Sequence, residues 1–96
     1  MDTEKFIRMC KFQIVKYFND RLSASDEDSR ISVKDVYVVW LSKVLQNNKA
    51  LLSTTVPDGM YYEITYNGDK HELYLDAYKK WENVVIPVVF KEDSDV

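Results

Sequence analysis

The sequence has few of the residues from which enzymes build reactive centres. Its 96 residues include one cysteine, one histidine, two glycines and two prolines. A single cysteine, Cys10, cannot close an internal disulfide, so nothing indicates an oxidising compartment. Cys and His pairs at metal-ligand spacing are absent, and neither glycine lies in a Gly-rich loop that could hold a phosphate. We therefore expect no metal site, no cofactor and no nucleotide-binding loop.

The few groups that could carry chemistry have simpler explanations. A nucleophile needs a neighbouring base, and the one histidine, His71, directly follows an expected turn, where a solvated side chain is typical. Cys10 projects from the apolar side of an expected helix, which favours a small buried side chain over a reactive thiol. The acidic run Asp26–Asp28 lacks the glycine and the alternating ligands of a calcium loop. The sequence thus predicts a protein that is not an enzyme.

Charge and hydropathy set further limits on partners and location. Thirteen Lys and Arg against sixteen Asp and Glu give a net charge of −3, which argues against a general electrostatic nucleic-acid binder. The balance is uneven, because residues 1–21 carry five basic and three acidic side chains. The first twenty residues lack the apolar core of a secretory signal, and no stretch approaches the about 20 apolar residues of a membrane span. We expect a cytoplasmic protein with no membrane partner.

Residues 3–22 follow the period of an amphipathic helix. Its apolar side collects Phe6, Ile7, Cys10, Ile14, Tyr17 and Phe18, and its opposite side collects Lys5, Arg8, Lys11 and Lys16. Residues 23–31 are expected to form a mobile linker, because SASDEDSR offers only small and charged side chains. Ser32 and Asp35 then fit a capping pattern that predicts one helical turn.

Beta-branched and aromatic residues predict a four-stranded antiparallel sheet over residues 36–76. The expected strands cover residues 36–45, 50–56, 60–66 and 71–75, with turns at 46–49 and 57–59. Asn67-Gly68 predicts a two-residue type I′ hairpin turn. Alternation in the first strand assigns Val36, Val38, Trp40 and Val44 to one face and Tyr37, Val39 and Leu41 to the other. Because both sets are apolar, we expect this strand in the centre of the sheet.

The C-terminal region is expected to return to helix before it ends in a tail. The spacing of Ala77, Tyr78, Trp81 and Val84 predicts a short helix over residues 77–84. Residues 85–96 form the tail, and VVIPVVF at 84–90 is either an added edge strand or a docking segment. The expected fold is one α+β domain: an N-terminal amphipathic helix, a four-stranded antiparallel meander, and a short C-terminal helix and tail packed on one sheet face.

Two surfaces are candidates for binding. If the apolar side chains of the last two strands face the core, the opposite face collects Tyr61, Glu63, Thr65, Glu72, Tyr74 and Asp76. This face either binds a protein through its tyrosines or only stabilises the sheet through cross-strand pairs. The alternative is the basic side of the first helix, with Lys5, Arg8, Phe12 and Lys16. There Phe12 is either an anchor for a partner or packs under residues 84–90.

Several segments carry a resemblance to a known family. They are VYVVW, LQNNKALLSTT, DGMYYE, TYNGDK and LYLDAYKKWEN, within residues 35–83, preceded by the helix MDTEKFIRMCKFQIVKYFND. In these segments the chain resembles a family of small uncharacterised proteins from phages and prophages of Gram-positive bacteria. The resemblance implies an accessory protein in the cytoplasm of the bacterial host, and it brings no catalytic residues to carry over. Small phage proteins of this kind often sequester host proteins, so it implies inhibition of a host factor or a defence protein.

Three hypotheses about function follow. The first is non-catalytic binding to a host protein through the tyrosine-rich, acidic sheet face. The second is a small nucleic-acid-binding module, because the order helix, antiparallel strands, helix is that of double-stranded RNA-binding domains and the first helix is basic. The third is a self-assembling structural protein that forms a homodimer or larger ring through residues 84–90.

Overall fold

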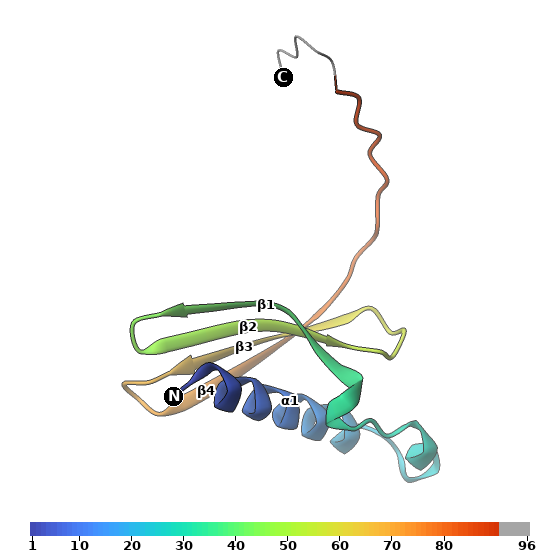
Figure 1. Cartoon of the computed structure of the whole chain (residues 1–96). Coiled ribbons are helices and arrows are strands. Elements are labelled where there is room, and N and C mark those ends of the chain that lie inside the picture. The colour runs from blue at the N-terminus through green and yellow to red at the C-terminus, as the bar shows by residue number, and fades with distance from the viewer. Residues whose placement is uncertain (91–96) are drawn as a thin grey trace.

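One helix lies across one face of a four-stranded sheet in the computed structural model, which describes residues 1–90 (Figure 1). The chain forms α1 (Thr3–Asp20), then two short 3-10 helices, η1 (Ala24–Ser29) and η2 (Val33–Asp35). The antiparallel strands β1 (Val36–Val44), β2 (Asn47–Thr54), β3 (Met60–Asn67) and β4 (Glu72–Lys79) follow in the order β1-β2-β3-β4. The expected α+β class and the four-stranded meander are confirmed.

Helix α1 is fixed at both ends by side chains near its termini. The Asp2 carboxylate accepts a hydrogen bond of 2.8 Å from the Lys5 amide, and this bond lowers the pKa of Asp2. At the other end the Arg21 guanidinium lies 3.4 Å from the Tyr17 ring centroid and donates to the Tyr17 carbonyl at 2.9 Å. The helix ends at Asp20, whereas the sequence predicted an end at residue 22.

The segment between α1 and the sheet is anchored by a buried amide. The Asn19 side chain donates to the Ile31 carbonyl at 3.0 Å and accepts from the Ile31 amide at 2.9 Å. Ile31 is buried in the core, so the end of the predicted linker is wrong, although residues 23–30 are all exposed as expected. The helical turn predicted at Ser32–Asp35 is confirmed by a capping box.

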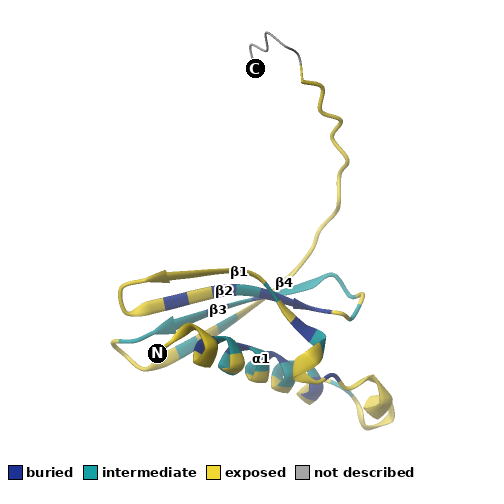
Figure 2. Ribbon diagram, in the orientation of Figure 1, coloured by how far each residue is buried: buried dark blue, intermediate teal, exposed yellow. Residues whose placement is uncertain are grey.

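The core lies between α1 and the sheet face that we call the inner face (Figure 2). Phe6, Cys10 and Ile14 of α1 are fully buried, as the helical period predicted. The sheet contributes Val36, Ala50, Leu52, Tyr62 and Ile64. Tyr17 meets Tyr62 edge to face, with ring centroids 5.8 Å apart. The opposite side of the sheet, the outer face, carries no helix within residues 1–90 (Figure 1).

Strand β1 is an edge strand, so its predicted central place is wrong. A β-bulge interrupts its pairing, because Val38 lies opposite Leu52 whereas Trp40 lies opposite Leu51. The extra residue, Val39, reverses the alternation beyond it. Trp40 and Val44 therefore lie on the outer face rather than with Val36 and Val38, and Leu41 lies on the inner face. The apolar character of both faces reflects this reversal, not burial on two sides.

Two turn predictions also differ from the structure. The first hairpin turns at Leu45–Gln46, with Leu45 at φ +55, and Asn47 already belongs to β2. Asn67 pairs with Glu72, which leaves a four-residue loop at 68–71 instead of a two-residue type I′ turn. The Asn67 side chain closes this loop by accepting from the amides of Asp69 and Lys70. The turn at Pro57–Gly59 is confirmed, with Gly59 at φ +72.

The predicted C-terminal helix over residues 77–84 is wrong. Ala77 pairs with Tyr62 and Tyr78 with Tyr61, which extends β4 to Lys79 and satisfies the backbone of β3. Beyond it, residues 80–90 have no helix or strand, and every one of them is exposed. This C-terminal segment leaves the sheet instead of packing on a face of it (Figure 1). The rest of the predicted tail, residues 91–96, lies outside the described residues.

Candidate protein-binding face

The outer face is built from four cross-strand rows of side chains. Register gives the rows Tyr37–Ser53–Tyr61–Tyr78, Trp40–Leu51–Glu63–Asp76, Ser42–Lys49–Thr65–Tyr74 and Val44–Asn47–Asn67–Glu72. The six residues predicted for this face, Tyr61, Glu63, Thr65, Glu72, Tyr74 and Asp76, all belong to it. The alternation of β3 and β4 is uninterrupted, which is why sequence alone placed them together.

Four further residues of this face were missed by the sequence reasoning. Tyr37, Trp40 and Tyr78 are 47%, 40% and 52% exposed, and Leu51 is half-buried beside them. Trp40 was missed because no residue of β1 marks the bulge that turns it outward. Tyr78 was assigned to a helix, although the alternation Tyr74, Asp76, Tyr78 was a signal for a longer strand.

Two tyrosines of the outer face help to line a shallow hollow. It has a volume of about 390 Å³ and is lined by Leu51, Tyr61, Tyr78, Lys79 and Lys80. Ser53, which pairs with Tyr61 in the same row, donates its hydroxyl hydrogen to the Met60 carbonyl at 2.8 Å. The lining of the hollow therefore combines apolar and aromatic side chains with two lysines.

Two acidic side chains of the outer face lie opposite each other on neighbouring strands. Glu63 lies directly opposite Asp76 on the neighbouring strand, and like charges in such a pair destabilise a sheet. Lys49 offsets part of this repulsion, with its ammonium 3.6 Å from the Glu63 carboxylate. The Tyr74 hydroxyl donates to the Glu72 carboxylate, and this bond raises the pKa of Tyr74. The face presents tyrosines, a tryptophan and an acidic margin.

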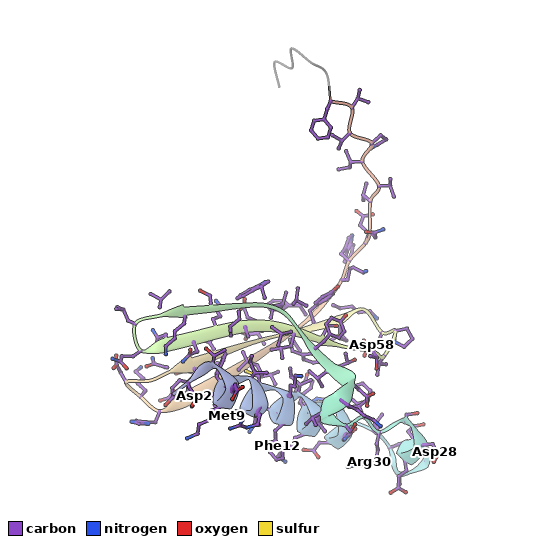
Figure 3. The ribbon with its side chains drawn as sticks, viewed as in Figure 1. Asp2, Met9, Phe12, Asp28, Arg30 and Asp58 are labelled. Atoms are coloured by element: carbon purple, nitrogen blue, oxygen red, sulfur yellow. The ribbon has the colours of Figure 1, made fainter. Side chains whose placement is uncertain are left out.

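The alternative basic surface lies on the far side of α1. Lys5, Arg8, Phe12 and Lys16 are all exposed, and Lys16 is paired with Asp20 at 3.1 Å. Phe12 is 58% exposed and points away from the sheet (Figure 3), so the prediction that it packs under residues 84–90 is wrong. A groove of about 500 Å³ between α1 and η2 is lined by Arg8, Lys11, Phe12, Val33 and Lys34.

The groups considered for chemistry lie in separate parts of the fold. Cys10 is fully buried in the core, and burial raises the pKa of its thiol to about 12, so it stays protonated at neutral pH. His71 is exposed in the loop between β3 and β4, with φ +54. Among residues 1–90, His, Cys, Asp and Glu form no group of three that could hold a metal ion. None of the helices in this part of the chain has the length and apolar character needed to cross a membrane.

Comparison with known proteins identifies a family and nothing closer. No curated protein and no solved structure matches the chain. A family model does match, over residues 7–88, and this range includes most of α1, all four strands and most of the C-terminal segment. Because the match covers most of the 96 residues, the chain belongs to that family, DUF6275, which is described as a family of unknown function.

Proposed function

We propose that the protein acts without catalysis, by binding another protein through the outer face of its sheet. The observation that carries this proposal is a partly exposed aromatic cluster on that face. It is formed by Tyr37, Tyr61 and Tyr78 of one row and by Trp40 of the next row, beside Leu51. Tyrosine and tryptophan are the residues that most often anchor protein interfaces, because they add large contact areas at low entropic cost. An open sheet face of this composition suits a protein partner.

The cross-strand charges favour binding over a purely structural role. A face selected only for stability would not place Glu63 directly opposite Asp76, because that pair costs free energy in the isolated protein. A partner that brings a basic side chain to this point would relieve the repulsion. We therefore propose a partner with an apolar patch bordered by Lys or Arg.

The dimensions of the face fit an interface of ordinary size. Four strands of about eight residues cover roughly 26 Å by 19 Å, or about 500 Å² before side-chain relief is added. Stable complexes bury about 800 Å² on each partner. Loops at the margin, such as Pro57–Gly59, would supply the remainder.

The resemblance to proteins of phages and prophages supports a biological setting for this activity. In that setting the partner is a host protein in the cytoplasm of a Gram-positive bacterium, and binding inhibits a host factor or a defence protein. The proposal needs no cofactor, because occupation of the partner's surface is sufficient for inhibition.

Affinity capture from a lysate of such a bacterium tests the proposal. The wild-type protein should retain one stoichiometric protein, identified by mass spectrometry. Tyr61→Ala with Tyr74→Ala, and separately Trp40→Ala with Tyr78→Ala, should each reduce retention at least about tenfold, because anchors of this type contribute about 2 kcal/mol or more. Phe12→Ala, a comparably exposed aromatic on α1, is the matched control and should retain the partner. Equal retention by all variants would refute the assignment of the face.

A nucleic-acid partner for the basic side of α1 has less support. The analogy with double-stranded RNA-binding domains required a second helix, and residues 77–79 are strand instead. The net charge of −3 also opposes binding to a polyanion. A gel-retardation experiment at low salt tests this alternative, and a shift that disappears when Lys5, Arg8 and Lys16 are all changed to Ala would establish it.

A further inference from the structure

We propose that the C-terminal end of one copy of the chain docks into the groove between α1 and η2 of a second copy. This inference is independent of the outer face and concerns the other side of the molecule. It connects two surfaces with apolar side chains that the fold leaves uncovered within residues 1–90. One is the groove, which includes Phe12 (labelled in Figure 3), and the other is the C-terminal segment.

The groove has the size and chemistry of a site for an apolar and acidic peptide. Its volume of about 500 Å³ exceeds that of the hollow on the outer face. Phe12 and Val33 form its apolar floor and are 58% and 51% exposed. The other three lining residues, Arg8, Lys11 and Lys34, are all basic.

The C-terminal segment has the complementary composition. Trp81 and Phe90 are 93% and 89% exposed, and the four valines and the isoleucine between them are also exposed. The sequence then continues with Lys91 and the acidic residues Glu92, Asp93 and Asp95. An apolar run followed by acids matches a groove with an apolar floor and a basic rim.

The segment is placed to reach a second copy. It runs away from both α1 and the sheet of its own chain (Figure 1). The radius of gyration of 17.4 Å exceeds the about 12.5 Å of a compact chain of this length, as an extended tail requires. Residues 80–90 contain no glycine, and their beta-branched side chains and Pro87 favour an extended chain over a reversal. Eleven extended residues reach about 36 Å, which is sufficient to enter a neighbouring groove.

The apolar area also fits a dimer. Two aromatic side chains bury about 300–500 Å², and five aliphatic residues add to this. A reciprocal exchange, in which each copy inserts its C-terminal end into the other, doubles the contact and closes the assembly. Across two copies the four aromatic side chains alone account for about 600–1,000 Å², and the aliphatic residues bring the contact toward the about 1,200–2,000 Å² that specific interfaces bury.

A complementary charge swap on the full chain tests this inference. The groove variant carries Arg8→Glu, Lys11→Glu and Lys34→Glu, and the tail variant carries Glu92→Lys, Asp93→Lys and Asp95→Lys. Size-exclusion chromatography with light scattering should give twice the chain mass for the wild type. Each variant alone should dissociate at concentrations at least about tenfold higher than the wild type, because like charges then meet across the contact. An equimolar mixture should recover the mass of a dimer.

Controls separate this result from a loss of folding. Lys70→Glu, in the exposed loop between β3 and β4, changes a charge outside both surfaces and should leave the mass of the dimer unchanged. Circular dichroism should show the same helix and sheet content in all variants. A wild type that is monomeric at every concentration would overturn the inference, since docking within one chain or onto another protein would then be the remaining uses of the segment. Dimers that survive both charge variants would overturn it as well.

Discussion

The two faces of the sheet differ in how much of their apolar surface is buried, and so in how much they stabilise the fold. The inner face holds Ala50, Leu52 and Ile64, which are completely shielded from solvent by α1. The outer face holds side chains of similar apolar character, including Trp40 and Tyr78, that remain about half exposed. Because hydrophobic stabilisation scales with the area removed from water, the first set contributes its whole apolar area to the stability of the fold and the second only part of it. The exposed part of the second set is available for a partner.

Neighbouring leucines on β2 give the sharpest test of this difference. Leu52→Ala should lower the free energy of unfolding by about 2–5 kcal/mol, because it removes a fully buried side chain from the core. Leu51→Ala, the adjacent residue on the outer face, should cost less than about 1.5 kcal/mol because water already reaches that position. Urea unfolding followed by circular dichroism measures both values. Equal losses would show that the two faces do not differ in stability.

The separation of the faces depends on register, and the turns at one end of the sheet help to set it. A Cβ atom at Gly68 would lie 2.4 Å from the Gln46 carbonyl oxygen, so the two turns approach too closely for any side chain. Gly68→Ala should therefore destabilise the protein by about 1–3 kcal/mol. Lys70→Ala in the same loop is the control and should be neutral within about 0.5 kcal/mol. Thermal unfolding of both variants checks this expectation, which fails if Gly68→Ala is as stable as the control.

Removal of one charge of the Glu63–Asp76 pair on the outer face should stabilise the protein, in contrast to the substitutions above. Asp76→Asn removes the repulsion with Glu63 and should raise the free energy of unfolding by about 0.2–1 kcal/mol. The same change should weaken binding of the proposed partner, which loses an acidic contact. Asp69→Asn, in the loop before β4, serves as the control for a lost negative charge. A destabilised Asp76→Asn variant would mean that the acid supports the fold itself.

Cys10 offers a test of inner-face burial through pH. Burial raises the pKa of the folded thiol from 9.0 to about 12, so above pH 9 the unfolded chain loses a proton that the folded chain keeps. The contribution of this group to stability is therefore complete below pH 9 and falls as the pH rises toward 12. Cys10→Ala should show a shallower loss of stability across this window than the wild type. Parallel slopes for the two proteins in urea titrations would contradict the burial of the thiol.

The parts of the fold that sequence predicted are those governed by local periodicity. The period of α1 and the capping box at Ser32 were sufficient to place both elements, and uninterrupted alternation placed all six predicted residues of β3 and β4 on one face. These patterns depend on backbone geometry that neighbouring residues share. The predicted partners and functions remain proposals.

The parts that sequence did not predict depend on contacts between distant residues. Nothing about Val39 or its neighbours in the sequence marks a β-bulge. The bulge is visible only in the pairing of β1 with β2. Ala77 and Tyr78 fit both a helix and a strand. The strand is formed because it pairs with the backbone of β3 at Met60–Tyr62. The longer β4 adds Tyr78 to the candidate face, and the bulge in β1 adds Trp40. With these residues the candidate face extends from β3 and β4 to the whole sheet.

Site-specific photocrosslinking in cells that express the protein tests the central claim most directly. A photoreactive phenylalanine analogue at Tyr78 on the outer face is compared with one at Phe12 on α1, two positions of similar exposure on opposite sides of the molecule. The outer-face position should cross-link to one other protein, and the helix position should yield only contacts between copies of the chain. A different protein captured at Phe12 and none at Tyr78 would contradict the claim that the open sheet face is the binding surface.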